Sequence, residues 1–291
     1  MSRLPSAEPD HAPVTRRPLI TRSRLVADLG GLGLGAYGES AVMVHAQMSA
    51  LGWVVGGAQT VVEALTEAIA PRGTLLVLTG WQDRPPYHQQ DWDAEERRLY
   101  REEAPAFDPR LARAEREHGR VPEAIRTWPG AQHSRHPVCA FAALGPAAEW
   151  LVAGQSLDDG YGEDSPLARL VTLGGTVLLV GDLFNSVTLL HYAEYRASAG
   201  PKRYVEYEMP VLLDGQRVWR RIRELDSSAG AFPYEKLALE EDAFAAITRA
   251  ALQAGIGRSG VVGAARAHLL PAPRLLDFAR AWLAERFGLR S

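Results

Sequence analysis

The chain has 291 residues, and its 46% hydrophobic and 23% charged residues are typical of globular proteins, which excludes a wholly disordered chain. A formal net charge of −3 argues against a nucleic-acid partner, and the single cysteine, Cys139, excludes an internal disulfide or a zinc site of several cysteines. No apolar run is long enough to span a bilayer, and the N-terminus carries no secretory signal. We therefore expect a cytoplasmic protein with a mobile tail over residues 1–18.

The first half of the chain alternates helical and strand patterns. Residues 20–29 predict a short helix that ends at glycines, and the apolar runs at 41–45 and 74–79 predict two buried strands. Between these strands, Thr60 and Glu63 have the spacing of a capping box at the start of a helix. A strand, a helix and a second strand in this order form the unit of a parallel sheet covered by helices.

Residues 91–126 differ from the segments on either side, because they are rich in charged residues and hold few apolar ones. Such a composition is typical of a solvated helical insertion. A lid, or the rim of a substrate site, is the alternative interpretation of this segment.

The regular pattern returns in the second half of the chain. Strands are predicted at 141–144 and at 175–181, where GTVLLVG is apolar, β-branched and bounded by glycines. Asn185 or Ser186 is placed to cap the helix that follows the second of these strands.

Asp214-Gly215 separates alternating runs over 204–213 and 216–225, and this dipeptide is a strong signal for a β-hairpin. Two further helical patterns follow the hairpin, and no internal repeat is present. We therefore expect one α/β domain over residues 19–291, an α/β/α sandwich around a mixed central sheet.

Gly33, Gly35 and Gly38 fit the G-x-G-x-x-G pattern of dinucleotide-binding loops. In that motif the glycines stand between a strand and a helix, whereas here a helix precedes them and a strand follows. A helix C-cap and turn is the better interpretation, so we set a nicotinamide-dependent oxidoreductase aside.

His191 is the first candidate for acid–base chemistry. It stands in the helix predicted after the strand at 175–181, and Thr188 and Glu194, three residues away on either side, share its helical face. Ligands of open α/β sheets bind beyond the carboxyl ends of the strands, where this helix begins. A hydrogen-bonded core histidine is the alternative interpretation.

Carboxylates mark two further places in the sequence. Glu224 and Asp226 stand two residues apart near the end of the second hairpin strand, so they share one face of it. Asp83 and Tyr87 lie in the loop WQDRPPY, directly after a predicted strand. The first pair suits orienting a histidine or binding a cation, with a solvent-facing strand edge as the alternative. The second place suits a sugar or a cation, with a proline-rich loop of packed aromatic rings as the alternative.

The segment HSRHP carries His133, Arg135 and His136, and Cys139 follows it. Two histidines three residues apart can bind a metal ion, but no third ligand stands nearby, so we expect no metal site. Arg135 is a candidate phosphate contact. For Cys139 we expect a buried apolar role rather than that of a nucleophile.

Six stretches of the chain carry a family resemblance: VMVHAQMSALGWVVGG, GTLLVLTGW, SRHPVCAFAALG, DSPLARLVTLGGTVLLVG, TLLHYAE and RELDSS. In this order they resemble the aminoglycoside 3-N-acetyltransferase family, especially members from aminoglycoside-producing actinomycetes. The resemblance covers residues 20 to 287. It implies a single α/β sandwich that differs from the common GNAT acetyltransferase fold. It also implies transfer of acetyl from acetyl-CoA to the 3-amino group of 2-deoxystreptamine.

The resemblance implies catalytic and substrate contacts as well. The histidine of TLLHYAE, His191 here, is the family's general base. Glu224 and Asp226 are implied to stand beside it, one orienting or charge-balancing the imidazole and the other meeting the cationic substrate. Thr188, or the backbone N–H groups of residues 46–49, are candidate donors to the oxyanion. The substrate contacts that the resemblance implies are Asp83 and Asp226. From residue chemistry we further expect Asp182 to attract a cationic substrate, and Tyr87 and Trp81 to stack on its rings or contact its ammonium groups.

For acetyl-CoA, the resemblance implies contacts from the loop after the first buried strand and from three later segments. This loop departs from the pattern of many members, because Ala46 and Gln47 stand where two serines are common, and a hydroxyl near the thioester is therefore missing. The implied coenzyme contacts are His45, Ala46, Gln47, Met48, Ser49, Gly56, Gly57, Arg135, His136 and Ser165.

The chemistry of these residues suits acyl transfer to an amine. An alkylamine is protonated at neutral pH and must lose a proton before it attacks, and an imidazole is a suitable base for that step. The sequence therefore predicts an enzyme that N-acetylates aminoglycosides with acetyl-CoA and so confers resistance. The alternatives are an enzyme that acetylates another small amine and a non-catalytic binder of coenzyme A or aminoglycosides.

Overall fold

The computed structural model describes residues 18–36, 40–86, 92–197, 200–228 and 230–289. The tail predicted over 1–18 lies almost wholly outside these residues, and so do Gly38 of the glycine motif and Tyr87. Within the described residues, no helix combines the length and the apolar character that crossing a membrane requires.

A mixed seven-stranded sheet forms the centre of the fold, in the order β10-β11-β7-β2-β4-β6-β5. The three inner strands β7, β2 and β4 are parallel, and the other strands pair antiparallel. The bounds are Val42–Ala46 for β2, Leu75–Leu78 for β4, Gln132–His133 for β5, Phe141–Leu144 for β6, Thr176–Val180 for β7, Arg258–Val262 for β10 and Ala265–Pro271 for β11.

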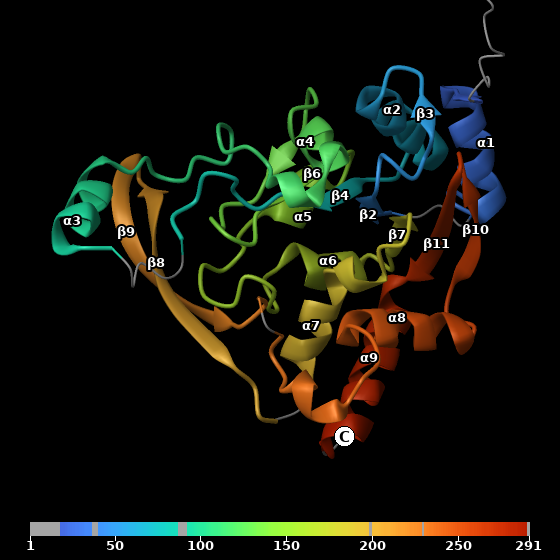
Figure 1. Cartoon of the computed structure of the whole chain (residues 1–291). Coiled ribbons are helices and arrows are strands. Elements are labelled where there is room, and N and C mark those ends of the chain that lie inside the picture. The colour runs from blue at the N-terminus through green and yellow to red at the C-terminus, as the bar shows by residue number, and fades with distance from the viewer. Residues whose placement is uncertain (1–17, 37–39, 87–91, 198–199, 229, 290–291) are drawn as a thin grey trace, which may run out of the picture.

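Helices cover both faces of this sheet, as the sequence predicts, and each face has its own apolar core (Figure 1). One face is covered by α1 (Arg22–Leu32), α2 (Ala58–Ile69) and α4 (Arg120–Arg126). The other is covered by α5 (Ala148–Val152), α6 (Pro166–Thr172), α7 (Leu189–Arg196), α8 (Ala243–Gln253) and α9 (Ala272–Phe287). The predicted α/β/α sandwich is therefore confirmed.

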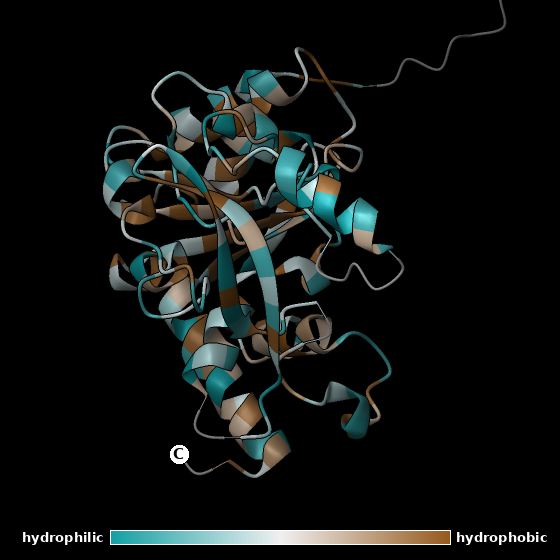
Figure 2. Cartoon of the chain, turned by 90° about the vertical axis from the view of Figure 1, so that its left-hand side faces the viewer, coloured by the Kyte–Doolittle hydropathy of each residue, from teal (hydrophilic) through white to brown (hydrophobic). Residues whose placement is uncertain are grey.

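A long hairpin stands apart from the sandwich. Strands β8 (Tyr204–Leu213) and β9 (Gln216–Leu225) have the predicted bounds, and Asp214 and Gly215 both take positive φ at the turn between them. Helix α3 (Ala94–Glu103) lies beside the hairpin and buries none of its residues (Figures 1 and 2). The charged segment that contains α3 is solvated there, as its composition predicts.

Three local predictions need correction. Helix α2 begins at Ala58 with Gly57 at its N-cap, so Thr60 lies inside the helix. The residue at the N-cap of α7 is Thr188, because Asn185 and Ser186 form the 3₁₀ turn η2 (Phe184–Ser186) ahead of it. Residues 120–126 are no solvated insertion, because α4 buries its Val121 and Ile125 side chains against the sheet. The remaining short elements are β1 (Leu19–Ile20), β3 (Trp53–Val54), η1 (Arg116–His118) and η3 (Tyr234–Leu237).

Candidate active site

His191 lies on α7, the helix that follows the carboxyl end of β7. Its Nδ1 atom is 2.9 Å from an oxygen of Glu194, one helical turn further along. The His191 side chain is 17% exposed and that of Glu194 only 2%, so a buried carboxylate holds an imidazole that reaches the surface of the core. Because Nδ1 is engaged, Nε2 is the ring nitrogen available to a ligand.

Glu194 is itself held in place by two hydrogen bonds to its second oxygen. The backbone N–H of Ala231 donates over 3.0 Å and the hydroxyl of Tyr234 over 2.8 Å. Burial and the neighbouring Glu194 carboxylate raise the pKa of Tyr234, so its hydroxyl keeps the proton that it donates. The carboxylate therefore has a single orientation, and it fixes the imidazole in turn.

Two cavities meet at His191. The larger has a volume of about 690 Å³ and the smaller about 490 Å³, and the linings share His191, Asn185 and Phe244. The larger cavity opens at the carboxyl ends of β2 and β7, where α/β sheets bind ligands. The smaller is bordered by residues before and at the start of α8, including Glu235, Glu241 and Asp242. An imidazole between two cavities is placed to act on two bound molecules.

The loop after β2 lines the larger cavity, and the five coenzyme contacts implied there, His45 to Ser49, are all part of that lining. His45 follows Met43 by two residues in β2, so it points to the sheet face that α7 covers. Burial, with a smaller contribution from His118, lowers the pKa of His45 to about 4. Its imidazole is therefore neutral at pH 7.

Thr188 and Asp182 also line the larger cavity. Thr188 stands at the N-cap of α7 without a capping hydrogen bond from its side chain. Among the backbone donors of the loop after β2, the N–H of Gln47 is already bonded to the Val180 carbonyl at 2.9 Å. The Gln47 N–H is therefore not free to donate to the oxyanion, and the predicted donors are reduced to Thr188 and the other N–H groups of residues 46–49.

Glu224 does not accompany His191, which corrects the predicted arrangement. It is buried in a second pair, with one oxygen 3.5 Å from Nε2 of His136, and it accepts from the Tyr207 hydroxyl and from the Cys139 thiol. Glu194 holds His191 instead, because it stands on the same helix at i+3. Asp226, just beyond β9, accepts from the backbone and hydroxyl of Ser228.

His136 uses both ring nitrogens inside the protein. Its Nδ1 accepts from the N–H groups of Val138 and Cys139, and its Nε2 donates to the carbonyl of Leu157 over 3.1 Å. Burial lowers the pKa of His136 and raises that of the neighbouring Cys139 thiol. In this arrangement both ring nitrogens of His136 and the Cys139 thiol are engaged by other groups of the protein.

The remaining five predicted coenzyme contacts need correction or stay open. His136 and Ser165 are fully buried, and Ser165 caps α6 by accepting from the N–H of Ala168, so neither faces a cavity. Arg135 is exposed, outside the lining of both cavities. Gly56 and Gly57 stand at the start of α2, also outside both linings. The roles of Arg135, Gly56 and Gly57 stay predictions.

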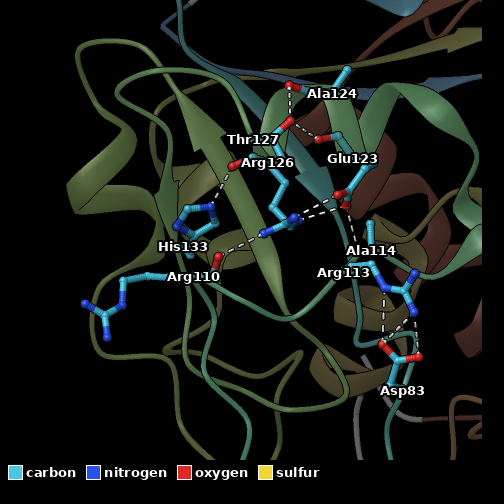
Figure 3. A network of polar contacts seen from close by, with 9 residues as sticks. All are labelled: Asp83, Arg110, Arg113, Ala114, Glu123, Ala124, Arg126, Thr127 and His133. Atoms are coloured by element: carbon cyan, nitrogen blue, oxygen red, sulfur yellow. Dashed lines mark hydrogen bonds and ion pairs between the residues drawn. The ribbon is translucent and has the colours of Figure 1, made fainter.

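The loop after β4 lies away from His191. Trp81 is only 4% exposed and packs against Phe107, so its ring is covered and the prediction that it stacks on substrate is wrong for this structure. Asp83 is half exposed and forms an ion pair with Arg113 at 2.9 Å (Figure 3). It lies outside both cavity linings, and its contact with substrate stays a prediction.

The sequence reasoning missed the rings around His191. Tyr161 stacks on the imidazole and Phe244 meets its edge, and these residues are 30 and more positions away in the chain. The contact with Glu194 had a signal, because i, i+3 neighbours on a helix touch. The aromatic contacts depend on how two loops and α8 pack, which no local spacing encodes.

The comparisons with known proteins identify the family. The sequence profile of the aminoglycoside 3-N-acetyltransferase family matches residues 43–284. Aminoglycoside N(3)-acetyltransferase VII of Streptomyces paromomycinus is 51% identical over 270 residues, which cover 92% of this chain and 93% of the relative. The chain therefore belongs to this family of acyltransferases, and its predicted likeness to actinomycete members is confirmed.

Solved structures of relatives share the fold. The structure of AAC-IIIb with CoASH superposes with a TM-score of 0.85 at 40% identity, covering 94% of this chain and 100% of that one. The structure of AAC-VIa bound to sisomicin gives a TM-score of 0.84 at 37% identity, covering 93% and 99%.

Proposed function

We propose that this protein transfers the acetyl group of acetyl-CoA to the 3-amino group of the 2-deoxystreptamine ring of aminoglycosides, with His191 as general base. The observation that carries this proposal is the position of His191. Its imidazole stands between two cavities. Glu194 is bonded to Nδ1, so Nε2 is left for a ligand. The relatives solved with CoASH and with sisomicin support the two ligand classes.

The larger cavity is the proposed site of the acetyl-CoA thioester. The loop over residues 45–49 lines it, and Arg120 adds a positive charge toward an anionic coenzyme. The smaller cavity is the proposed site of the acceptor. Its lining holds three carboxylates, Glu235, Glu241 and Asp242. Glu235 and Glu241 are paired with Arg203 and Arg249, and Asp242 caps α8, so the ammonium groups of a polycation would compete with these arginines for the carboxylates.

The transfer needs one base and no covalent enzyme intermediate. The 3-ammonium group first releases one proton to solvent; Nε2 of His191 then takes a second proton as the neutral amine nitrogen attacks the thioester carbonyl carbon. The carbonyl π electrons move to oxygen, and they return as the carbon–sulfur bond breaks with its electron pair on the thiolate. The imidazolium then gives its proton to that thiolate, and Glu194 stabilises the imidazolium in between. The products are the acetamide and free coenzyme A.

A turnover assay tests this proposal. Purified protein is mixed with acetyl-CoA and a panel of 2-deoxystreptamine aminoglycosides, thiol release is followed, and the product is examined by mass spectrometry and NMR. We expect thiol release with the acetyl group on the 3-amino nitrogen. Acetylation at another nitrogen, or no release with any aminoglycoside despite coenzyme binding, would overturn it. A second panel of simple diamines then shows whether a different amine is the acceptor.

A further inference from the structure

The ring of Tyr161 covers one face of the His191 imidazole. The two ring centroids are 4.8 Å apart and the ring planes differ by only 14°, which is a parallel stack. Phe244 meets the same imidazole at 4.8 Å with its plane tilted by 60°. With Glu194 on Nδ1, the two aromatic rings fix the plane of the imidazole as well as its position.

Tyr161 comes from the loop between α5 and α6, which is fastened to the core. The side-chain amide of Gln155 donates to two carbonyl groups, that of Cys139 over 2.9 Å and that of Gly160 over 2.7 Å. The ring of Tyr161 packs edge-on against Phe141 of β6, with centroids 6.3 Å apart. The tyrosine is therefore held through its loop backbone and by its contact with Phe141.

The buried His136 ring packs directly against this loop. His136 donates to the Leu157 carbonyl of the loop. A Cβ atom at Gly160 would lie 2.8 Å from Nε2 of His136 and 2.9 Å from Cβ of Cys139, closer than a side chain tolerates. Only glycine permits this approach, and Tyr161 is the next residue. The buried His136 and Cys139 side chains thus support the active site through this loop and through a hydrogen bond between Cys139 and the Tyr161 hydroxyl.

A stacked aromatic face also favours one charge state of the imidazole, because the negative face of the ring attracts a cation held above it. Several charged and titratable groups surround His191 from other elements as well, and a substitution at Tyr161 leaves all of them in place. They are Glu194 on α7, His45 on β2, Asp182 after β7, Glu117 and His118 of η1, Arg120 of α4, Tyr234 and Glu235 of η3, and Glu241 and Asp242 before α8. A change of pH profile in a Tyr161 variant is therefore assigned to the ring.

We propose that Tyr161 is a positioning residue of the acetyl transfer: its ring holds the His191 imidazole in the plane from which Nε2 reaches the amine, and it stabilises the imidazolium that forms. This inference rests on the proposed role of His191 as general base. The positioning acts through the face of the ring, so that any aromatic ring of similar shape at this place performs it.

The first experiment compares pH profiles of kcat/KM. Tyr161→Leu and Tyr161→Met remove the ring, Tyr161→Phe keeps it, and Tyr204→Leu removes a ring that stacks under Arg223 on the hairpin and, within the described residues, has no ring contact with His191. In the two ring-less variants we expect kcat to fall roughly 10- to 100-fold, because a base turned out of line attacks poorly. The acid limb should move down by roughly half a pH unit, since the protonated imidazole loses its cation–π partner.

The conservative variant and the control decide the interpretation. Tyr161→Phe should restore both kcat and the position of the acid limb, and Tyr204→Leu should change neither. A ring-less variant with an unmoved acid limb and unchanged kcat would overturn the proposal. So would a Phe variant as impaired as the Leu variant, since the hydroxyl rather than the ring would then be at work.

The second experiment needs no turnover and therefore separates this proposal from the proposed function. The ring C–H signals of His191 are assigned with a His191→Asn variant and titrated by NMR in each protein without substrates. Stacking shifts these signals upfield, so we expect them downfield in Tyr161→Leu and unchanged in Tyr204→Leu. If the wild type acetylates no aminoglycoside while the NMR result holds, only the proposed function fails. Signals that stay in place in the ring-less variants would overturn the stack itself.

Discussion

Two histidine–glutamate pairs lie in the same domain, and they differ in what surrounds them. His191 and Glu194 are bonded at 2.9 Å, and the histidine is 17% exposed between two cavities. His136 and Glu224 lie 3.5 Å apart, with the histidine side chain fully buried. The groups are chemically alike, yet only the first pair leaves a ring nitrogen to a ligand.

The partners of the two glutamates explain this difference. One oxygen of Glu194 contacts Nδ1 of His191, and the other accepts hydrogen bonds from the Ala231 N–H and the Tyr234 hydroxyl, so Glu194 fixes the orientation of the imidazole. Glu224 gathers the Tyr207 hydroxyl of β8 and the Cys139 thiol, and so joins the hairpin to the core. We therefore propose that the His191–Glu194 pair, at the junction of the two large cavities, serves catalysis and that the more deeply buried His136–Glu224 pair serves stability.

The sharpest way to break this comparison is to make one substitution in both pairs. We expect His191→Asn to lower kcat about 10²–10⁴-fold, the usual contribution of a positioned general base. Coenzyme A binding, measured by calorimetry, should be unchanged. His136→Asn should instead lower the free energy of unfolding by about 1–3 kcal/mol for each buried group left unpaired, measured by urea titration.

The reverse pattern would contradict the assignment. A His191→Asn protein that keeps most of its turnover is incompatible with a general base at this position. A His136→Asn protein that is as stable as the wild type but as inactive as the His191→Asn protein would make His136 and Glu224 the catalytic pair.

The glutamates provide the second test of the comparison. Glu194→Gln should lower kcat roughly 10²-fold, because an amide can present its N–H to Nδ1 and no longer stabilises the imidazolium. Glu224→Gln should affect the urea midpoint more than kcat. Equal losses of kcat in both variants, at unchanged stability, would return Glu224 to the catalytic role that the family resemblance implies.

Much of the fold follows from local signals in the sequence. The hairpin has the predicted strands because Asp214 and Gly215 both accept positive φ, a property of the turn itself. Strand β7 was readable because its residues are apolar on both faces, as a strand under two helical layers requires. The positions of the helix N-caps at Gly57 and Thr188 could not be predicted from the sequence, because tertiary packing decides where each helix begins.

The candidate site was predictable to a smaller extent. His191 and its neighbour Glu194 share one helix, so their spacing carried the contact. The alternation along β9 predicted that Glu224 and Asp226 share one face, but Asp226 lies just beyond the strand, and alternation could not tell which histidine Glu224 meets. That choice depends on how the segment around His136 folds over the hairpin, 88 residues before Glu224 in the chain. Long-range contacts of this kind have no signal in one sequence.

The buried imidazoles of His45 and His136 make the stability of the protein depend on pH in a predictable way. Burial lowers the pKa of His45 to about 4 and also lowers that of His136, whereas an unfolded histidine titrates near 6.5. Below pH 6.5 the unfolded chain therefore binds protons that the folded chain refuses, and stability falls as the pH falls toward 4.

Without ligands, His45 should contribute a slope of about 1.4 kcal/mol per pH unit between its folded pKa of about 4 and the unfolded value near 6.5, and His136 should add a slope of the same sign. Urea unfolding between pH 7 and 4.5 measures the slope. His45→Gln should make it shallower by that amount near pH 5, and a slope equal to that of the wild type would show that His45 is not held neutral by the fold.

The smallest expected effect concerns Asp182, which lines the larger of the two cavities beside His191. It lies two residues after β7 and three residues before Asn185, which lines both cavities. Asp182→Asn removes one negative charge from this region. We expect a fall of a few-fold in kcat/KM for a polycationic aminoglycoside, since an exposed charge contributes about 1 kcal/mol or less. The fall should shrink at high salt, where such fields are screened.

Asp214→Asn is the matched control for this charge, because it changes the net charge equally at the hairpin turn, and asparagine accepts the positive φ found there. It should leave kcat/KM unchanged at every salt concentration. The KM for acetyl-CoA discriminates further: losing a carboxylate beside an anionic coenzyme should leave that constant unchanged or lower it. A rise in the KM for acetyl-CoA, with none for the aminoglycoside, would mean that Asp182 serves the donor, and that the acceptor's ammonium groups bind elsewhere around His191.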